Sequence, residues 1–163
     1  KIYEKLWDLI EGTDELKDCI INYITETQKM EVVDGTIKST LPLSSYEFVN
    51  CIVLDGIYEN SNFYGCEISN SQISKSKFDA CDVENSKVLS CRVENSSLKN
   101  CYFMNGFLNG DMIGGVYRSG ELGPYAVVSP ETKIVGVTDN FFDIKFDKQQ
   151  KEEDKGAIKG FKK

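Results

Sequence analysis

The sequence predicts a mainly β fold, a parallel β-helix whose short strands stack into a rod, and two observations predict it. A large apolar residue recurs every five positions through the middle of the chain, and a small residue stands two positions before almost every one of them. A period of five fits neither an α-helix, with about 3.6 residues per turn, nor a flat strand, with a period of about 2. It is typical of a chain that turns a corner every five residues and points one small and one large side chain inward from each pentamer.

The two series define the predicted core. The large series runs without a failure from Phe48 to Ile113, and the small series begins at Cys51, with Asp111 as its one departure. Asn is favoured two positions after the large residue. Four pentamers are expected to close a four-sided coil of about twenty residues, so that about 3.5 coils stack at the strand spacing of about 4.8 Å. One predicted column of stacked residues is Phe48, Ile68, Val88 and Leu108.

The repeating unit resembles that of a known family. The small–x–large triplet, as in Cys66-Glu67-Ile68 and Cys81-Asp82-Val83, is similar to the signature of the pentapeptide-repeat proteins over residues 46–115. The resemblance implies a right-handed quadrilateral β-helix. The sequence departs from the family in using Val and Ile often at the centre, where Leu or Phe is common, and Cys and Ser in place of Ala.

Four segments flank the predicted β-helix. Residues 1–30 are expected to form a helical hairpin, residues 31–45 an extended lead-in, and residues 116–147 a short β segment that caps the rod. Nine of the sixteen residues 148–163 are charged, and the segment predicts a disordered tail. The apolar stripes of the hairpin favour packing on the first coil, and a docking or oligomerisation element is the alternative. These stripes comprise Ile2, Leu6, Trp7 and Ile10, then Leu16, Cys19, Ile20, Tyr23 and Ile24.

The cysteines are predicted to be core residues. Five of the six occupy one phase of the five-residue repeat, where Cys serves as a compact apolar side chain. In a twenty-residue coil only Cys81 and Cys101 would stack in adjacent coils, and we expect free thiols. The chain has no His to complete a zinc site and no CxxC pair, so we expect no metal and no cofactor.

The composition argues against several classes of function. The chain of 163 residues has 19 Lys and Arg against 26 Asp and Glu, a net charge of −7, which disfavours direct binding of nucleic acid or of an anionic membrane. The absence of His removes the common catalytic triads, and no paired carboxylates or phosphate-binding loop replace them. We therefore expect no enzyme. No signal peptide is seen in this chain, and a cytoplasmic or virion-associated location is expected. Because the first residue is Lys1 and not Met, we also expect the sequence to be a fragment or a processed form.

Apolar residues at outward positions predict where the rod is covered or bound. The N-terminal hairpin is expected to cover a first set, which comprises Val49, Ile52, Leu54, Ile57 and Tyr64. A second set near the end of the repeat is predicted to form an interaction patch, covered in part by residues 116–146 and in part by a protein partner or a second subunit. This patch comprises Leu89, Tyr102, Met104, Phe107 and Met112.

These observations favour a non-enzymatic structural or protein-interaction module, a rigid scaffold that docks within a larger assembly such as a phage virion. The family resemblance implies one alternative, because some pentapeptide-repeat proteins mimic duplex DNA and bind type II topoisomerases such as DNA gyrase. A mimic about 17 Å long would need about ten net negative charges. Residues 46–115 carry nine acidic and five basic residues, a net charge of −4, which disfavours the alternative.

Overall fold

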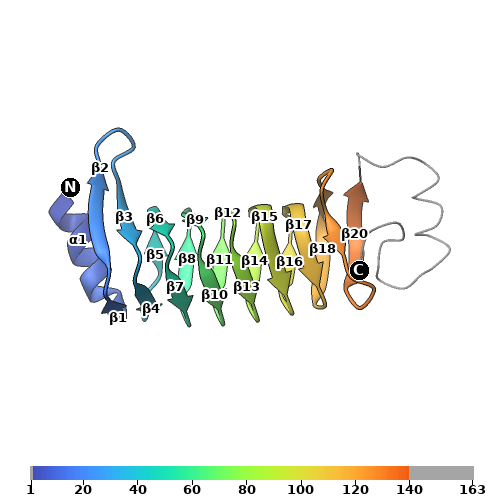
Figure 1. Cartoon of the computed structure of the whole chain (residues 1–163), viewed down its shortest axis with the longest axis horizontal. Coiled ribbons are helices and arrows are strands. Elements are labelled where there is room, and N and C mark those ends of the chain that lie inside the picture. The colour runs from blue at the N-terminus through green and yellow to red at the C-terminus, as the bar shows by residue number, and fades with distance from the viewer. Residues whose placement is uncertain (1, 140–163) are drawn as a thin grey trace.

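The computed structural model of the chain describes residues 2–139, which form a parallel β-solenoid of about seven turns. The coils stack into a straight rod with helix α1 (Ile2–Glu11) across one end and strand β20 (Lys133–Asp139) at the other (Figure 1). The predicted fold class, a mainly β parallel solenoid, is confirmed.

The coil has three faces of about five residues, and the predicted four-sided coil of twenty residues is wrong. Each strand pairs in parallel with strands fifteen residues away, so that Phe63 lies between Phe48 and Phe78. The spacing of five fixes the distance between corners and leaves the number of corners open. A three-sided interior brings side chains of different faces into contact, as where Tyr58 meets the edge of Phe48 with ring centroids 5.6 Å apart.

Three faces, here named A, B and C, run the length of the rod. Face A contains β3 (Lys29–Val33), β6 (Tyr46–Val49), β9 (Asn62–Tyr64), β12 (Lys77–Asp79) and the first parts of β15 (Arg92–Lys99) and β17 (Phe107–Ile113). Face B contains β4 (Thr36–Ser39), β7 (Ile52–Leu54), β10 (Glu67–Ser69), β13 (Asp82–Glu84), the later parts of β15 and β17, and β19 (Val127–Val128). Face C contains β5 (Leu43–Ser44), β8 (Ile57–Glu59), β11 (Gln72–Ser74), β14 (Lys87–Leu89), β16 (Tyr102–Met104), and the first parts of β18 (Val116–Leu122) and β20.

The corners explain why Asn recurs in the sequence. The residue two positions after each central apolar residue adopts a left-handed backbone, as at Asn70 (φ 52°) and Asn85 (φ 51°). Asn tolerates this conformation better than most residues because its short polar side chain bonds locally. Gly65 occupies the equivalent corner with φ 65°, where a side chain would be strained. The Asn series therefore marks the turns of the solenoid.

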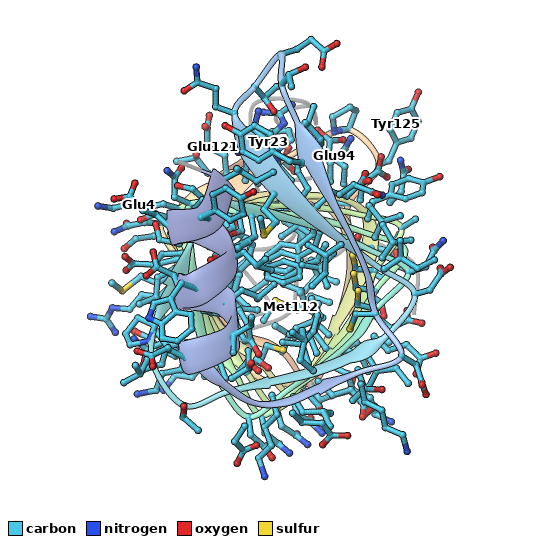
Figure 2. All side chains as sticks on the ribbon, turned by 90° about the vertical axis from the view of Figure 1, so that its left-hand side faces the viewer. Glu4, Tyr23, Glu94, Met112, Glu121 and Tyr125 are labelled. Atoms are coloured by element: carbon cyan, nitrogen blue, oxygen red, sulfur yellow. The ribbon has the colours of Figure 1, made fainter. Side chains whose placement is uncertain are left out.

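The fifteen-residue coil of the middle of the rod loses one residue after Glu94. The register of β15 against β17 shifts between Glu94 and Ser97, so that Leu98 pairs with Met112 fourteen residues on. Gly110 takes the place of the small residue, because a Cβ there would lie 2.3 Å from the Ser96 carbonyl oxygen. Asp111, the departure in the small series, thus faces outward. Met112 is buried at the centre of the coil (Figure 2), and Ile113, the predicted core residue, is exposed.

The C-terminal β segment continues the rod instead of capping it. Strand β18 pairs with β16 and then with β17, and β20 pairs with β18 across two faces. The core column continues through Tyr117 and Leu122, both fully buried. The segment therefore adds coils and does not fold back over the predicted patch. Residues 140–147, and the tail predicted at 148–163, lie outside the described residues.

The N-terminal region contains one helix, and the predicted helical hairpin is wrong. In place of the second helix the chain forms β1 (Thr13–Lys17), antiparallel to β4, and β2 (Ile20–Ile24), antiparallel to β3. Asp18, with φ 59°, interrupts any helix between them. The lead-in at 31–45 belongs to the first coil, which begins at Lys29. Strands β1 and β2 pair with the edge that this coil would otherwise leave bare.

The interior combines aromatic stacks with ladders of small polar side chains. The rings of Phe48, Phe63 and Phe78 stack with centroids 5.0 and 5.2 Å apart. Ser71, Ser76 and Ser86 are buried, as predicted, and the exposed positions predicted for Glu67, Lys77 and Asp82 are confirmed. The hydroxyl of each of these three serines accepts a hydrogen bond from a backbone N–H fifteen residues earlier and donates one to the backbone carbonyl two residues before it. The small column therefore satisfies the backbone at each corner.

Replacing one buried hydroxyl should expose this role. Ser76 Oγ accepts a hydrogen bond from the Ser61 backbone N–H at 3.1 Å and donates to the Ser74 carbonyl at 2.8 Å. Ser76→Ala leaves the buried Ser61 N–H without its acceptor and should lower the free energy of unfolding by about 1–3 kcal/mol. Urea denaturation measures the loss. Ser74→Ala, on the half-buried outward side of the neighbouring strand, is the control and should change little.

Candidate protein-interaction surfaces

Outward side chains of the solenoid stand in straight columns. Each three-residue strand buries its central residue and turns its two neighbours outward, as in β13, where Val83 is buried between the exposed Asp82 and Glu84. Because the strands pair in register, each outward residue lies beside its counterpart in the next coil. The rod thus presents fixed rows of side chains at the strand spacing of about 4.8 Å.

Three of the five predicted patch residues come together on face C. Leu89 pairs with Met104, and Tyr102 lies on the same strand as Met104, to whose sulfur its hydroxyl donates a hydrogen bond at 3.3 Å. All three are half-buried. Val116, the partner of Tyr102 in the next coil, extends the apolar row. We name Leu89, Tyr102 and Met104 the face C patch.

The other two predicted residues lie elsewhere. Phe107 is half-buried on face A, where the guanidinium of Arg92 stacks 4.3 Å from its ring centroid. Arg92 Nε also contacts Glu94 at 2.8 Å, which holds the cation over the ring. Met112 is a core residue and was wrongly assigned to the patch, because the shortened coil turns it inward.

The first apolar set is left uncovered by the N-terminal region. Ile52, Ile57 and Tyr64 are exposed by 43%, 41% and 54%. Helix α1 lies instead across the end of the rod, where Leu9 is fully buried and Lys5 Nζ lies 4.0 Å from the Tyr46 ring centroid. The predicted cover of these side chains by the N-terminal segment is therefore wrong, because that segment closes the end of the core.

Helix α1 divides its apolar residues between two faces. Tyr3, Trp7 and Ile10 are exposed by 81%, 60% and 50%, and their spacing i, i+4, i+7 places them on one helical face. Leu6 and Leu9 pack against the core, whereas Ile2 is 42% exposed. Trp7 and Ile10 were grouped with Leu6 in one predicted stripe that packs on the first coil, and Tyr3 was not included. The packing expected of Trp7 and Ile10 is wrong, and the alternative of a docking or oligomerisation element stays a prediction.

The cysteines are free and structural. Cys51, Cys66 and Cys81 stand fifteen residues apart in one column, so the predicted stacking of Cys81 on Cys101 is wrong. Burial raises the pKa of the Cys91 thiol to about 12 and that of Cys101 to about 11. Both thiols are therefore protonated near neutral pH and are poor nucleophiles.

A groove follows the corner between faces B and C. It has a volume of about 750 Å³, and its lining includes the amide side chains of Asn70, Gln72, Asn85 and Asn100. Within residues 2–139 no group of three or more Cys, Asp or Glu side chains could hold a metal ion. In the same range, the helix is too short to cross a bilayer.

Comparison with known proteins adds no family assignment. No protein-family model matches the chain, and no curated protein matches it significantly.

Proposed function

We propose that the protein is a non-enzymatic scaffold that binds other protein through the outward rows of its solenoid, as a part of a larger assembly. The observation that carries the proposal is the face C patch, where Leu89, Tyr102 and Met104 form a continuous apolar surface on rigid strands. A contiguous apolar surface marks an interaction site. We propose a protein partner or homo-oligomer, no cofactor, and a cytoplasmic or virion location, of which a phage virion is one setting.

The repeat supports a relation to the pentapeptide-repeat proteins. The small–x–large triplet recurs in each coil, and its small and large members are buried, as at Cys66 and Ile68. We propose that the chain is a three-sided relative of that family, with three pentamers per coil in place of four. The right-handed winding implied by the resemblance stays a prediction.

The charge distribution continues to disfavour the DNA-mimicking alternative. A solenoid of about seven turns is about 34 Å long, and duplex DNA of that length carries about twenty negative charges. Residues 29–139 carry fourteen acidic and nine basic residues, a net charge of −5. The longer rod widens the shortfall, because the added coils bring little further negative charge.

A photo-crosslinking amino acid at position 102 tests the proposal in the full chain, expressed in cells that normally produce it. We expect a cross-linked product of defined mass from position 102 and none from position 77, because Lys77 is exposed on the polar middle of face A. Leu89→Ser with Met104→Ser, made in the chain that carries the photo-crosslinking amino acid at position 102, should abolish the complex and its cross-link. The melting temperature should stay nearly unchanged, because both side chains are only half-buried.

Tyr64→Ser is the matched control, since Tyr64 is an exposed aromatic residue outside the patch. It should leave the cross-link intact. Two results would contradict the proposal. One is a collapse of the melting temperature in the double variant with the complex unaffected, and the other is the absence of any cross-linked product from position 102.

A further inference from the structure

The outer row of helix α1 is the most exposed apolar surface among the described residues. Tyr3, Trp7 and Ile10 expose half or more of their surface on one helical face, and Leu41, 55% exposed, lies beside the end of the helix. The Leu41 backbone N–H bonds to the Gly12 carbonyl at 3.2 Å, which fixes this junction. The inner face of the helix already closes the core. The outer row therefore contributes nothing to the fold of a single chain.

A groove beside Trp7 shows which kind of ligand could bind next to this row. The groove has a volume of about 560 Å³ and is lined by two aromatic residues, Trp7 and Tyr23, and by Glu4, Lys5, Asp8 and Gln28. Figure 2 shows Glu4 at the outer side of the helix and Tyr23 on the hairpin above it. The one lysine is engaged, because Lys5 Nζ donates to the Ser44 carbonyl and lies over the Tyr46 ring. The groove thus combines aromatic walls with negative charge.

The charge of the cap excludes a cap-to-cap dimer. Residues 2–18 carry six acidic and two basic residues, a net charge of −4. Two such caps packed face to face would bring like charges together and would be disfavoured. The occupant of this surface must combine apolar side chains with positive charge.

Residues 155–163 of the chain have that composition. The sequence Lys-Gly-Ala-Ile-Lys-Gly-Phe-Lys-Lys carries four lysines, no acidic residue, and two large apolar residues, Ile158 and Phe161. We call residues 155–163 the basic segment. Its charge of +4 matches the −4 of the cap, and its Ile and Phe match the aromatic walls of the groove.

Chain length favours the cap of a second copy over the segment's own cap. Residue 139 lies at the opposite end of the rod from α1 (Figure 1). The fifteen residues 140–154 could span at most about 50 Å, and a flexible chain of that length spans about 21 Å on average. Its own cap lies beyond about seven turns, or about 34 Å of rod. Reaching it would require residues 140–154 to extend to about two thirds of their maximum span, well beyond the average span, whereas a second copy can approach freely.

We propose that the basic segment of one copy binds the acidic apolar cap of the next, at Tyr3, Trp7 and Ile10, and so joins the rods head to tail. The contact is heterologous, because two different surfaces meet, and it therefore extends into open chains instead of closing a dimer. This inference rests on the proposed scaffold function and names a second copy of the chain as one of its partners.

Trp7 reports the contact directly, because it is the single Trp of the chain. In the full chain, raising the concentration should increase the sedimentation coefficient and shift the Trp7 emission to shorter wavelength together. Ile158→Ser with Phe161→Ser should weaken association at least tenfold and return the emission to that of exposed Trp. Ile57→Ser with Tyr64→Ser removes one aliphatic and one aromatic side chain from the side of the rod and should leave both measurements unchanged.

A charge exchange tests the electrostatic part of the contact. Asp8→Lys with Glu11→Lys should weaken association, and adding Lys159→Glu and Lys162→Glu to the same chain should restore it. Added salt should weaken the wild-type contact. Rescue by the exchanged chain would not be expected if the first two substitutions merely damaged the helix.

Three results would overturn the proposal. The first is a monomer with constant emission at all concentrations, and the second is association unaffected by Ile158→Ser with Phe161→Ser. The third is Trp7 emission at short wavelength at every protein concentration, with a shift to longer wavelength in the variant Ile158→Ser with Phe161→Ser. This result would show that the basic segment binds the cap of the same chain. The scaffold function would stand in each case if Leu89→Ser with Met104→Ser still abolished the cross-link from position 102.

Discussion

Val83→Asp is expected to abolish folding of the solenoid under ordinary conditions. Val83 is fully buried at the centre of face B, between Ile68 and Leu98 of the adjacent coils. A carboxylate at this position would be an unpaired charge among apolar side chains, which costs about 3–5 kcal/mol. That loss approaches the entire stability of many small domains, about 5–15 kcal/mol.

The neighbouring residue supplies the control. Glu84 is exposed on the same strand, and Glu84→Lys should change the free energy of unfolding by only a few tenths of a kcal/mol. Circular dichroism and urea denaturation of both variants make the comparison. Similar losses at positions 83 and 84 would contradict the alternation of inward and outward side chains on which the fold depends.

Phe63→Ala should cause the second large loss. Phe63 is 1% exposed and stacks with both Phe48 and Phe78, and its ring also meets the edge of Tyr58 at a centroid distance of 6.1 Å. Removing the ring leaves a cavity that three rigid coils cannot close, and such truncations cost about 3–5 kcal/mol.

The measurement is again the free energy of unfolding in urea, with Tyr64→Ala as the control. Tyr64 follows Phe63 in the sequence and is 54% exposed, so its truncation should cost well under half as much. Hydrogen exchange should show the loss of protection concentrated in β6, β9 and β12, because each coil contacts only its neighbours. An equal loss of protection along the whole rod would contradict that nearest-neighbour picture.

The inward and outward positions of the repeat could be predicted from the sequence. Burial at Ser71, Ser76 and Ser86 follows from their phase alone, although Ser is a polar residue. The number of residues per coil could not be predicted, because every multiple of five preserves that phase. The coil size depends on how side chains of different faces fill the interior, as Phe48 and Tyr58 do, and this contact has no signature in a one-dimensional pattern.

The repeat was predicted to end at Ile113, although the sequence shows that it continues. After Gly110 the spacing of five resumes one residue earlier, through Met112, Tyr117 and Leu122. A search that keeps a strict five-residue phase no longer finds the buried apolar residues after Gly110. The Gly-rich stretch at that point is also typical of loops. A search that allowed a single deletion would have extended the core and removed Met112 from the candidate patch.

The candidate surfaces were harder to predict than the core. Leu89, Tyr102 and Met104 were identified because their phase turns them outward, and only the fifteen-residue register places them together. Trp7 and Ile10 were expected to pack on the first coil, and Tyr3 was left out of the predicted stripe, because an apolar residue on a short helix is normally assigned to the core. Which side of α1 faces the rod is decided by tertiary contacts such as that of Lys5 with Tyr46.

The three-sided coil also restricts how such a chain can change in length. Inserting or deleting one pentamer would preserve every buried position, yet it would rotate all later residues by one face about the long axis. A pentamer inserted between Leu89 and Tyr102 would move Tyr102 and Met104 off face C, and the face C patch would be divided. Only steps of three pentamers keep the outer rows in line, so the molecule can evolve its length freely only in whole turns.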